Sequence, residues 1–285
     1  MKLLRFGLPG QERPGMLGPE GEIRDLGDHL PDLADEALDP ARLAVLATLD
    51  PTALPRVGGC PRLGPPVGGR GKIVCVGLNY ADHAREANMA IPSEPVLFMK
   101  GCRLTGPTDP IPVPPGAAKV DWEVELAVVM GRVASHVGEA EALACVAGLA
   151  AFIDMSERAY QLEQGGQWVK GKSYPGFAPL GPWLVTLDEV ADVQRLPLWL
   201  DVNGQRYQHS NTEQMIFSVA ALVAYISRFM TLYPGDVIAT GTPPGVGMGL
   251  KPEPVFLKAG DMVRCAIEGL GEQHHTLEAA SGGGG

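Results

Sequence analysis

The sequence lacks the features that mark nucleic-acid-binding and membrane proteins. Its 285 residues contain no cluster of Lys and Arg, and the formal net charge of −10 argues against a nucleic-acid partner. No apolar run approaches about 18 residues, so no membrane-spanning helix is expected. The N-terminal residues lack the apolar centre of a secretory signal peptide. We therefore expect neither a nucleic-acid nor a membrane partner.

Cysteine pairs are also missing. The five cysteines are odd in number, and no two of them are spaced as Cys-x-x-Cys. They are typical of reduced thiols in a cytoplasmic protein, where disulfides are rare. A zinc site built from thiolates is correspondingly disfavoured, so a metal in this protein would need oxygen ligands.

The composition is sufficient for a large core, since 45% of the residues are hydrophobic. Gly and Pro are concentrated between residues 58 and 69, which is typical of a linker. We predict a small N-terminal domain with its linker at residues 1–68 and a main domain at residues 69–278. Residues 279–285 form a Gly-rich, linker-like tail, which we expect to be flexible and exclude from the fold prediction.

Strand patterns outnumber helix patterns. Apolar runs predict strands at residues 2–6, 72–78 and 96–100, and Asn203-Gly204 predicts a hairpin. Helices are predicted at residues 79–88 and 139–149, and a third after a Ser-Asn-Thr-Glu capping box at residues 210–213. Because strands do not alternate strictly with helices, we predict an α+β fold with a mixed, mainly antiparallel sheet.

An acidic pair at the start of an apolar strand is the most informative feature. Glu123 and Glu125 are two residues apart, so both carboxylates project from one face of the predicted strand. The two charges repel each other, and Asp154 adds a third carboxylate at the end of another apolar run. A hard cation such as Mg²⁺ or Mn²⁺ would neutralise this set. For the pair alone, a solvated strand face is the more frequent explanation.

Three further features are candidates for catalysis or substrate binding, although none of them is specific when taken alone. His83 and Glu86 are spaced i, i+3 on a predicted helix, where a carboxylate could orient the imidazole of a general base. Lys172 lies in a Gly-flanked segment and could stabilise an oxyanion. The Gly-rich loop at residues 241–249 could hold a substrate carboxylate through its N–H groups and Thr242. Each also has a structural explanation, as a surface pair, a surface lysine or a turn.

The order of the motifs identifies a family resemblance. Along the chain follow Gly77-Leu78-Asn79-Tyr80-Ala81-Asp82-His83, Phe98-Met99-Lys100, Asp121-Trp122-Glu123-Val124-Glu125-Leu126, Asp154-Met155-Ser156-Glu157-Arg158, Gly171-Lys172-Ser173, Pro234-Gly235-Asp236 and Thr240-Gly241-Thr242-Pro243. From residue 72 to about residue 277 this series resembles the fumarylacetoacetate hydrolase (FAH) superfamily. The first region resembles the small N-terminal domain of a bacterial branch that includes proteins labelled ureidoglycolate lyase and 2,4-diketo-3-deoxy-L-fuconate hydrolase.

The resemblance implies a mixed β-sandwich roll surrounded by helices, usually as a homodimer. It implies Mg²⁺ or Mn²⁺, with Ca²⁺ as a substitute, held by Glu123, Glu125 and Asp154. The catalytic residues that it implies are His83, Glu86 and Lys172, with the His/Glu pair on a segment that acts as a lid in relatives. The substrate contacts that it implies are Thr242, Gly241, Arg158, Gln161, Tyr80 and Lys100.

The expected reaction is hydrolysis of a C–C bond in a 2,4-diketo acid (an acylpyruvate) to pyruvate and a carboxylic acid. His83 and Glu86 would activate water for attack on the 4-carbonyl, and the C3–C4 bond would then break. Two alternatives stay open: a decarboxylase, tautomerase, isomerase or hydratase of 2-oxo acids, and a metal-dependent 2-oxo-acid binder without turnover. The loops at residues 101–105 and 174–176 depart from the family's usual sequence, which leaves the acyl group of the substrate open.

Overall fold

The structure is a computed structural model that describes residues 1–86 and 90–280. In this part of the chain the strands are β1 (Lys2–Phe6), β2 (Arg13–Leu17), β3 (Ile23–Asp25), β4 (Leu63–Gly64), β5 (Ile73–Gly77), β6 (Val96–Lys100), β7 (Ile111–Val113), β8 (Val120–Asp121), β9 (Val124–Met130), β10 (Val146–Ile153), β11 (Ser156–Glu157), β12 (Leu180–Val185), β13 (Pro197–Val202), β14 (Gln205–Asn211), β15 (Val237–Ala239), β16 (Met262–Ile267) and β17 (Gly271–Ala279). The α-helices are α1 (Pro40–Leu46), α2 (Ala81–Glu86), α3 (Glu139–Ala142), α4 (Val169–Lys172) and α5 (Val219–Ser227).

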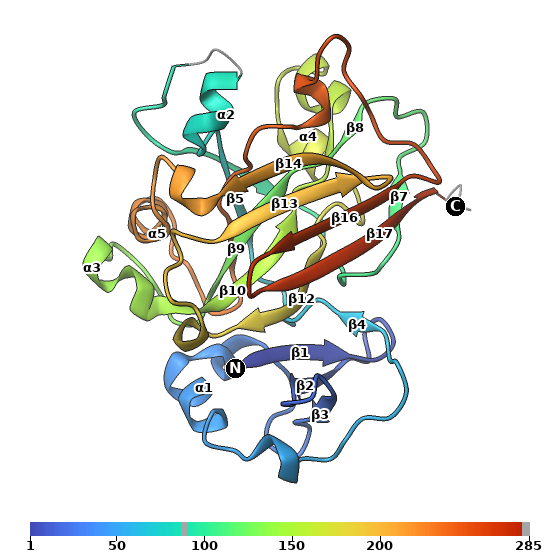
Figure 1. Ribbon diagram of the computed structural model, residues 1–285. Coiled ribbons are helices and arrows are strands. Elements are labelled where there is room, and N and C mark those ends of the chain that lie inside the picture. Colours follow the sequence, from blue (N-terminus) through green and yellow to red (C-terminus); the bar gives the residue numbers. More distant parts are fainter. Residues whose placement is uncertain (87–89, 281–285) are drawn as a thin grey trace.

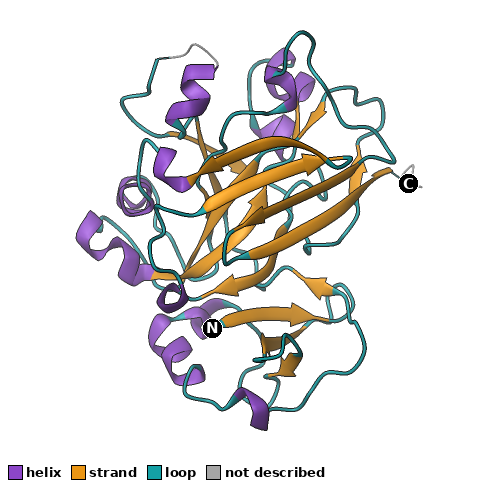
Figure 2. Ribbon diagram, viewed as in Figure 1, coloured by secondary structure: helices purple, strands orange, loops and turns teal. Residues whose placement is uncertain are grey.

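Two sheets form the main body of the molecule (Figure 1). The larger sheet has the order β3-β2-β1-β12-β10-β9-β15-β5-β6, with β4 beside β1, and the smaller has the order β14-β13-β16-β17-β7. Neighbouring strands run antiparallel except for β15 beside β5 and β17 beside β7. Figure 2 shows short helices around a body of strands. The predicted α+β fold with a mixed, mainly antiparallel sheet is therefore confirmed.

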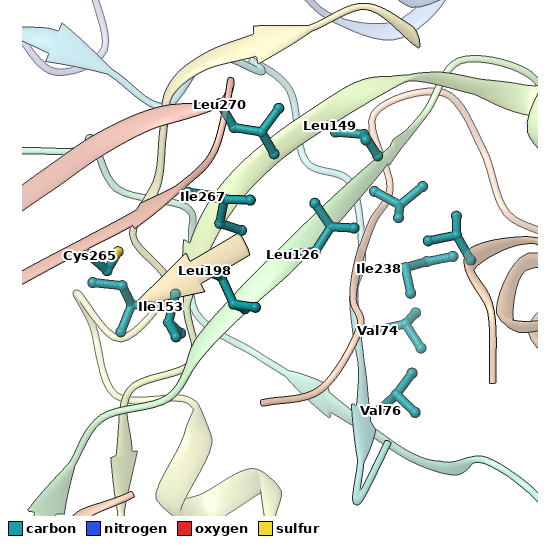
Figure 3. Close-up of a cluster of buried hydrophobic side chains, with 14 of the residues drawn as sticks. Val74, Val76, Leu126, Leu149, Ile153, Leu198, Ile238, Cys265, Ile267 and Leu270 are labelled. Atoms are coloured by element: carbon teal, nitrogen blue, oxygen red, sulfur yellow. The ribbon is translucent and has the colours of Figure 1, made fainter. Parts of the chain in front are cut away.

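The main core lies between these two sheets (Figure 3). Val74, Leu126 and Ile238 come from the larger sheet, and Leu198 and Ile267 come from the smaller one; each is at most 1% exposed. Every residue of β9 is buried, whereas β16 alternates between buried and more exposed residues. One face of the smaller sheet is therefore exposed to solvent. Strand β9, in contrast, is buried on both of its faces.

The N-terminal region continues the larger sheet. β1 pairs with β12 through Leu3 and Leu184, and β1 lies beside the main body in the lower part of Figure 1. Its apolar residues belong to a second core cluster that also contains Cys75, Val129 and Phe152 of the central strands. The two predicted regions therefore share both a sheet and a core.

The prediction for residues 139–149 was partly wrong. Helix α3 ends at Ala142, a single 3₁₀ turn follows at Leu143–Cys145, and β10 begins at Val146. β10 pairs along its length with β9, so burial in the central sheet overrides the helix propensity of an Ala-rich segment.

The predicted capping box at residues 210–213 does not begin the long helix. Asn211 accepts a hydrogen bond from the Glu213 N–H at 3.0 Å and caps only a 3₁₀ turn. The residue that caps α5 is Ser218, whose hydroxyl accepts from the Ala221 N–H at 3.2 Å. The apolar stripe predicted for this helix comprised Ile216, Val219, Ala220, Val223, Ile226 and Met230. Val219, Val223 and Ile226 are buried on α5, whereas Ile216 and Met230 lie outside the helix.

The remaining predictions of secondary structure can be compared directly with the structure. The strands at residues 2–6, 72–78 and 96–100 and the hairpin at Asn203-Gly204 are present as β1, β5, β6 and β13–β14. The helix predicted at residues 79–88 is shorter, and residues 87 and 88 lie outside the described part of the chain, as do residues 281–285 of the tail. Within residues 1–86 and 90–280, no helix is both long enough and apolar enough to cross a membrane.

Candidate functional site

The ends of three neighbouring strands bring the acidic residues together. β9 begins opposite the end of β10, with Val124 paired to Ile153, so Glu123 and Asp154 lie side by side. The Asp154 N–H donates to the Glu123 carbonyl at 2.9 Å. β15 runs antiparallel to β9 and leads to Gly241, whose N–H donates to Glu125 Oε2 at 2.8 Å.

Glu123, Glu125 and Asp154 form one buried cluster. Each offers a carboxylate oxygen, and these oxygens all lie within 4.8 Å of one another. The side chains come from the start of β9 and the end of β10, although Glu123 immediately precedes the strand in which it was predicted. The structure thus places the three predicted metal ligands together.

Three cations lie against this cluster. Lys172, the last residue of α4, donates to Glu123 Oε2 and to Asp154 Oδ2, each at 2.7 Å. Lys100 contacts the other oxygen of Asp154 and also donates to the Met155 carbonyl at 3.0 Å. Arg158 Nη2 lies 2.7 Å from Glu123 Oε1. The buried carboxylates are therefore paired on several sides.

A fourth carboxylate holds Arg158 and the Gly-rich loop in place. Asp121 is fully buried, and its Oδ2 accepts from Arg158 Nε at 2.8 Å. Its two oxygens also accept from the N–H groups of Gly247 at 2.7 Å and Met248 at 3.0 Å. Asp121 was not among the predicted site residues, although its spacing from Glu123 repeats that of the acidic pair.

The electrostatic state of the cluster follows from burial and from these neighbours. Burial, together with the charges of Asp154 and Glu123, raises the pKa of Glu125 well above its ordinary value. Burial would also raise the pKa of Glu123, but Lys172 and Arg158 outweigh it and lower the pKa of Glu123 to about 2. Burial opposes the charge of Lys172, but Asp154 and Glu123 raise its pKa above the ordinary value. Glu125 is thus the carboxylate whose negative charge is not sufficiently compensated by neighbouring cations.

The donor set fits a divalent cation. With every group ionised, the four carboxylates Asp121, Glu123, Glu125 and Asp154 and the three cations Lys100, Arg158 and Lys172 give a formal excess of one negative charge in a buried volume. Every candidate ligand atom is a carboxylate oxygen, the type preferred by Mg²⁺, Mn²⁺ and Ca²⁺. A divalent ion would turn this excess into one positive charge, which would favour an anionic substrate.

His83 lies near the acidic cluster, on α2. It lines the same cavity as Glu123 and Glu125. The neighbouring Asp82 fixes the helix, because its carboxylate accepts from the Ser210 hydroxyl on β14 at 2.5 Å. Glu86 ends α2, but its side chain lies outside the part that the structure describes, so the His/Glu pair remains a prediction.

Three of the residues predicted to contact substrate, Gly241, Thr242 and Gln161, form hydrogen bonds within the protein. Thr242 donates its hydroxyl to the Val124 carbonyl at 2.9 Å and accepts from Gln208 Nε2 at 2.8 Å. The N–H of Gly241 already bonds to Glu125. Gln161 lines the cavity, and its Oε1 accepts from Arg158 at 3.0 Å. In this arrangement Gly241 and Thr242 position the β9 segment.

Tyr80 and Lys100 are not among the described residues that line the cavity. Lys100 is buried under Asp154, as described above. Tyr80 is fully buried, and its hydroxyl has no hydrogen-bond partner among the described residues. Burial and the negative charge of Glu125 raise the pKa of Tyr80 well above its ordinary value, so this hydroxyl stays protonated.

A cavity of about 340 Å³ opens onto the cluster. Its apolar walls contain residues that sequence reasoning missed: Phe98, Leu162, Trp168 and Met248. The rings of Phe98 and Trp168 pack edge to face with their centroids 5.3 Å apart, and Lys172 Nζ lies 5.0 Å from the Phe98 centroid. Phe98 belongs to the Phe98-Met99-Lys100 motif and Met248 to the Gly-rich loop, but neither was predicted to line the site, because the four residues come from separate segments.

The chain matches known proteins along its length. Residues 72–278 match the family model described as fumarylacetoacetate (FAA) hydrolase C-terminal. A Burkholderia multivorans protein, named provisionally as a hydrolase, is 59% identical over 281 residues, which is 98% of this chain and 100% of that protein.

Two solved structures share the fold. Fumarylacetoacetate hydrolase from psychrophilic Exiguobacterium antarcticum is 35% identical, with a TM-score of 0.87 over 98% of this chain and 99% of that one. Maleylpyruvate hydrolase from Sphingobium sp. SYK-6, in complex with manganese(II) and pyruvate, is 32% identical, with a TM-score of 0.79 over 99% of this chain and 100% of that one. The chain therefore belongs to the fumarylacetoacetate hydrolase family of enzymes.

Proposed function

We propose that this protein hydrolyses the C3–C4 bond of an acylpyruvate, with Mg²⁺ or Mn²⁺ held by Glu123, Glu125 and Asp154. The observation that carries the proposal is the convergence of this buried acidic cluster with Lys172 and His83 around one cavity. The manganese and pyruvate named with the related maleylpyruvate hydrolase support it. When bound, the metal would act as a Lewis acid and stabilise negative charge on the 2-oxo acid.

The protein's own side chains would perform the remaining steps. His83, which lines the cavity, would take a proton from water as the water attacks the 4-carbonyl. Lys172 is held as a cation beside the acidic cluster and would stabilise the oxyanion that develops there. Cleavage of the C3–C4 bond gives a carboxylic acid and pyruvate enolate, which takes up a proton to become pyruvate.

The test is the release of pyruvate from a panel of acylpyruvates, measured with Mg²⁺, with Mn²⁺ and with EDTA. We expect metal-dependent turnover, a loss of at least about 100-fold in Glu125→Ala, and a similar loss in His83→Ala. Unchanged turnover of Glu125→Ala in EDTA would exclude the mechanism. Decarboxylation of oxaloacetate that survives in His83→Ala, with no acylpyruvate cleaved by the wild type, would favour a decarboxylase instead.

A further inference from the structure

Val124 separates the two glutamates of the proposed metal site, and its backbone lies beyond the end of a neighbouring strand. The Glu123 carbonyl accepts from the Asp154 N–H at 2.9 Å, on the edge of β9 that faces β10. Because the backbone groups of successive strand residues point to opposite edges, the N–H and C=O of Val124 point to the edge that faces β15. The register of β15 with β9 ends at the pair Ala239–Ala127, before it reaches Val124. Both polar groups of Val124 therefore need partners other than β15.

Two buried side chains supply these partners and form a closed ring of hydrogen bonds with Val124. The Val124 N–H donates to Gln208 Oε1 at 2.9 Å, and Gln208 Nε2 donates to Thr242 Oγ1 at 2.8 Å. The Thr242 hydroxyl donates to the Val124 carbonyl at 2.9 Å and closes the ring. Gln208 Nε2 also donates to the Pro243 carbonyl at 2.9 Å. Gln208 is fully buried and Thr242 is 7% exposed, so these hydrogen bonds are shielded from bulk water.

The direction of every hydrogen bond in this ring is fixed by the chemistry of its partners. The Val124 N–H can only donate, and the carbonyls of Val124 and Pro243 can only accept. The amide of Gln208 must therefore direct its oxygen to the Val124 N–H and its nitrogen to the Pro243 carbonyl. A carboxylate at position 208 could not donate, and an apolar side chain could neither donate nor accept.

The ring restrains Glu125 through two connections. Val124 precedes Glu125 in β9, and Gly241, the residue before Thr242, donates its N–H to Glu125 Oε2 at 2.8 Å. Gln208 comes from β14 of the smaller sheet (Figure 1), so it joins that sheet to the start of β9 and to the loop after β15. A shift of either partner of Gln208 would therefore displace a candidate metal ligand.

We propose that Gln208 is a positioning residue that fixes the separation of Glu123 and Glu125, and thereby the size of the divalent ion that the site prefers. The inference rests on the proposed metal site and goes beyond it, because it concerns how the site selects among ions. Mg²⁺ requires oxygen ligands at about 2.0–2.1 Å in near-ideal octahedral geometry, whereas Ca²⁺ accepts about 2.3–2.6 Å and a flexible geometry. A loosened ring would therefore weaken the binding of Mg²⁺ more than that of Ca²⁺.

The experiment measures metal binding directly, without turnover. The electron paramagnetic resonance signal of free Mn²⁺ gives the Kd for Mn²⁺, and competition gives the Kd values for Mg²⁺ and Ca²⁺. Gln208→Met keeps the length of the side chain but removes both of its hydrogen-bonding groups. We expect it to weaken Mg²⁺ binding by about 10- to 100-fold, the usual effect of losing an outer hydrogen-bond partner of a metal site, and Ca²⁺ binding by a smaller factor.

Two variants at position 242 test the ring independently. Thr242→Val removes the hydroxyl at nearly constant shape and should shift the ratio of the Mg²⁺ and Ca²⁺ Kd values in the same direction, whereas Thr242→Ser keeps the hydroxyl and should retain the wild-type ratio. The double variant Gln208→Met/Thr242→Val should weaken Mg²⁺ binding little more than either single change, because each change alone opens the ring. Gln205→Met makes the same substitution at an exposed residue of β14 and should leave all three Kd values unchanged.

The outcomes separate this inference from the proposed metal site. If the wild type binds none of the three ions, the metal site is wrong and the inference fails with it. If the wild type binds them but Gln208→Met weakens all three by one common factor, or by none, the metal site stands and the assignment of Gln208 is wrong. Thermal unfolding in EDTA shows whether each variant is folded. Should Gln208→Met not fold, an unchanged ratio of Kd values in folded Thr242→Val would contradict the proposal.

Discussion

Lys172 neutralises two of the three candidate metal ligands. Its Nζ lies 2.7 Å from both Glu123 Oε2 and Asp154 Oδ2, and its side chain is almost fully buried. A buried ion pair gains little over an apolar pair of the same shape, but removal of one partner is costly because the other charge remains unpaired. Lys172 therefore affects stability and metal binding in opposite directions.

We predict that Lys172→Met is less stable than the wild type in EDTA and gains more stability from Mn²⁺. The loss should be about 3–5 kcal/mol, because Glu123 and Asp154 lose their shared cation. The added ion then compensates both carboxylates without competition from the ammonium group. Thermal unfolding with and without Mn²⁺ measures both effects.

Lys170→Met is the matched control for this prediction. Lys170 lies on the same helix but is exposed, and among the described residues its Nζ donates to the Gln164 carbonyl alone, at 2.7 Å. It should unfold as the wild type does, with the same response to Mn²⁺. Equal metal responses in Lys172→Met and Lys170→Met would show that Lys172 does not compete with the metal.

Glu125 gives the metal-free protein a dependence on pH. Its pKa is raised in the folded state, whereas in the unfolded chain it is near 4.5. The unfolded chain therefore loses its proton first as the pH rises above 4.5, and the metal-free fold loses stability until the pH passes the folded pKa. In EDTA, Glu125→Gln should remove this loss, be more stable than the wild type at pH 7, and gain less from Mn²⁺.

Urea unfolding in EDTA between pH 4.5 and pH 8 measures the pH effect. The comparison is Glu163→Gln, which changes an exposed carboxylate paired with Lys119 at the surface. This control should follow the wild-type profile. If the profiles of Glu125→Gln and the wild type ran parallel over the whole range, a raised pKa of Glu125 in the fold would be contradicted.

Local sequence predicted the identity of the central residues better than their contacts. The carboxylates of Glu123, Glu125 and Asp154 could be grouped because each lies at one end of an apolar run. The contact between Lys100 and Asp154 joins residues 54 positions apart, and no periodicity signals such a pair. Gln208 was missed for the same reason, although it donates to Thr242 Oγ1 from the opposite sheet.

At the scale of elements, strands were more predictable than helices. In β5 pattern and burial agree, because its first four residues are apolar and buried. β6 was also predicted from an apolar run, although its apolar residues are only partly buried and Lys100 is its buried residue. The start of α5 was harder to predict, because two nearby residues can serve as an N-cap. Asn211 and Ser218 each accept a backbone hydrogen bond, and Ser218 is the one that begins α5. α4 has only four residues and no hydrophobic stripe of its own, so its presence depends on packing against the candidate site.

The packing of α4 leaves no room for a side chain at Gly171. A Cβ there would lie 2.4 Å from the Glu157 carbonyl oxygen and 2.6 Å from Gln161 Cβ. We predict that Gly171→Ala displaces α4, costs about 3 kcal/mol of stability and lowers activity, because Lys172 follows immediately. Gly101→Ala should be tolerated, since its nearest contact, Ser173 Oγ, is 3.5 Å away.

Denaturant unfolding and acylpyruvate turnover measure the two Gly variants. Activity of Gly171→Ala at the wild-type level would mean that α4 accommodates the methyl group without moving Lys172. A comparable loss in Gly101→Ala would instead point to a general sensitivity of the β6–α4 contact, because Gly101 bonds to Ser173 through its N–H at 2.7 Å.

At the scale of the whole molecule, the N-terminal region completes the structure. Leu3 pairs with Leu184 across β1 and β12, and the amino group of Met1 bonds to Thr186 Oγ1 at 2.6 Å. Composition predicted the region and its linker, but it could not show that β1 covers an edge of the central sheet. That edge is defined only once β12 and β10 have paired.

We predict that a chain that begins at residue 69 does not fold on its own. It would expose the edge of β12 and half of a shared core, including the surroundings of Phe152. We expect aggregation or a non-cooperative thermal transition by circular dichroism, whereas the full chain should unfold cooperatively. A soluble, cooperatively unfolding fragment that binds Mn²⁺ would show that residues 69–278 form an independent domain.

The pairing of Lys100, Arg158 and Lys172 with the acidic cluster also affects whether the chain folds before or after it binds a metal ion. These cations pair with Asp154, Asp121 and Glu123 before any metal arrives, and the raised pKa of Glu125 favours its neutral form. The nascent chain can therefore complete its sheets without an ion as a nucleus, unlike a zinc finger, whose folding depends on its metal. For the proposed metal site, ion uptake would then be a late and reversible step, and the active fraction of the protein would follow the cell's supply of free divalent ions.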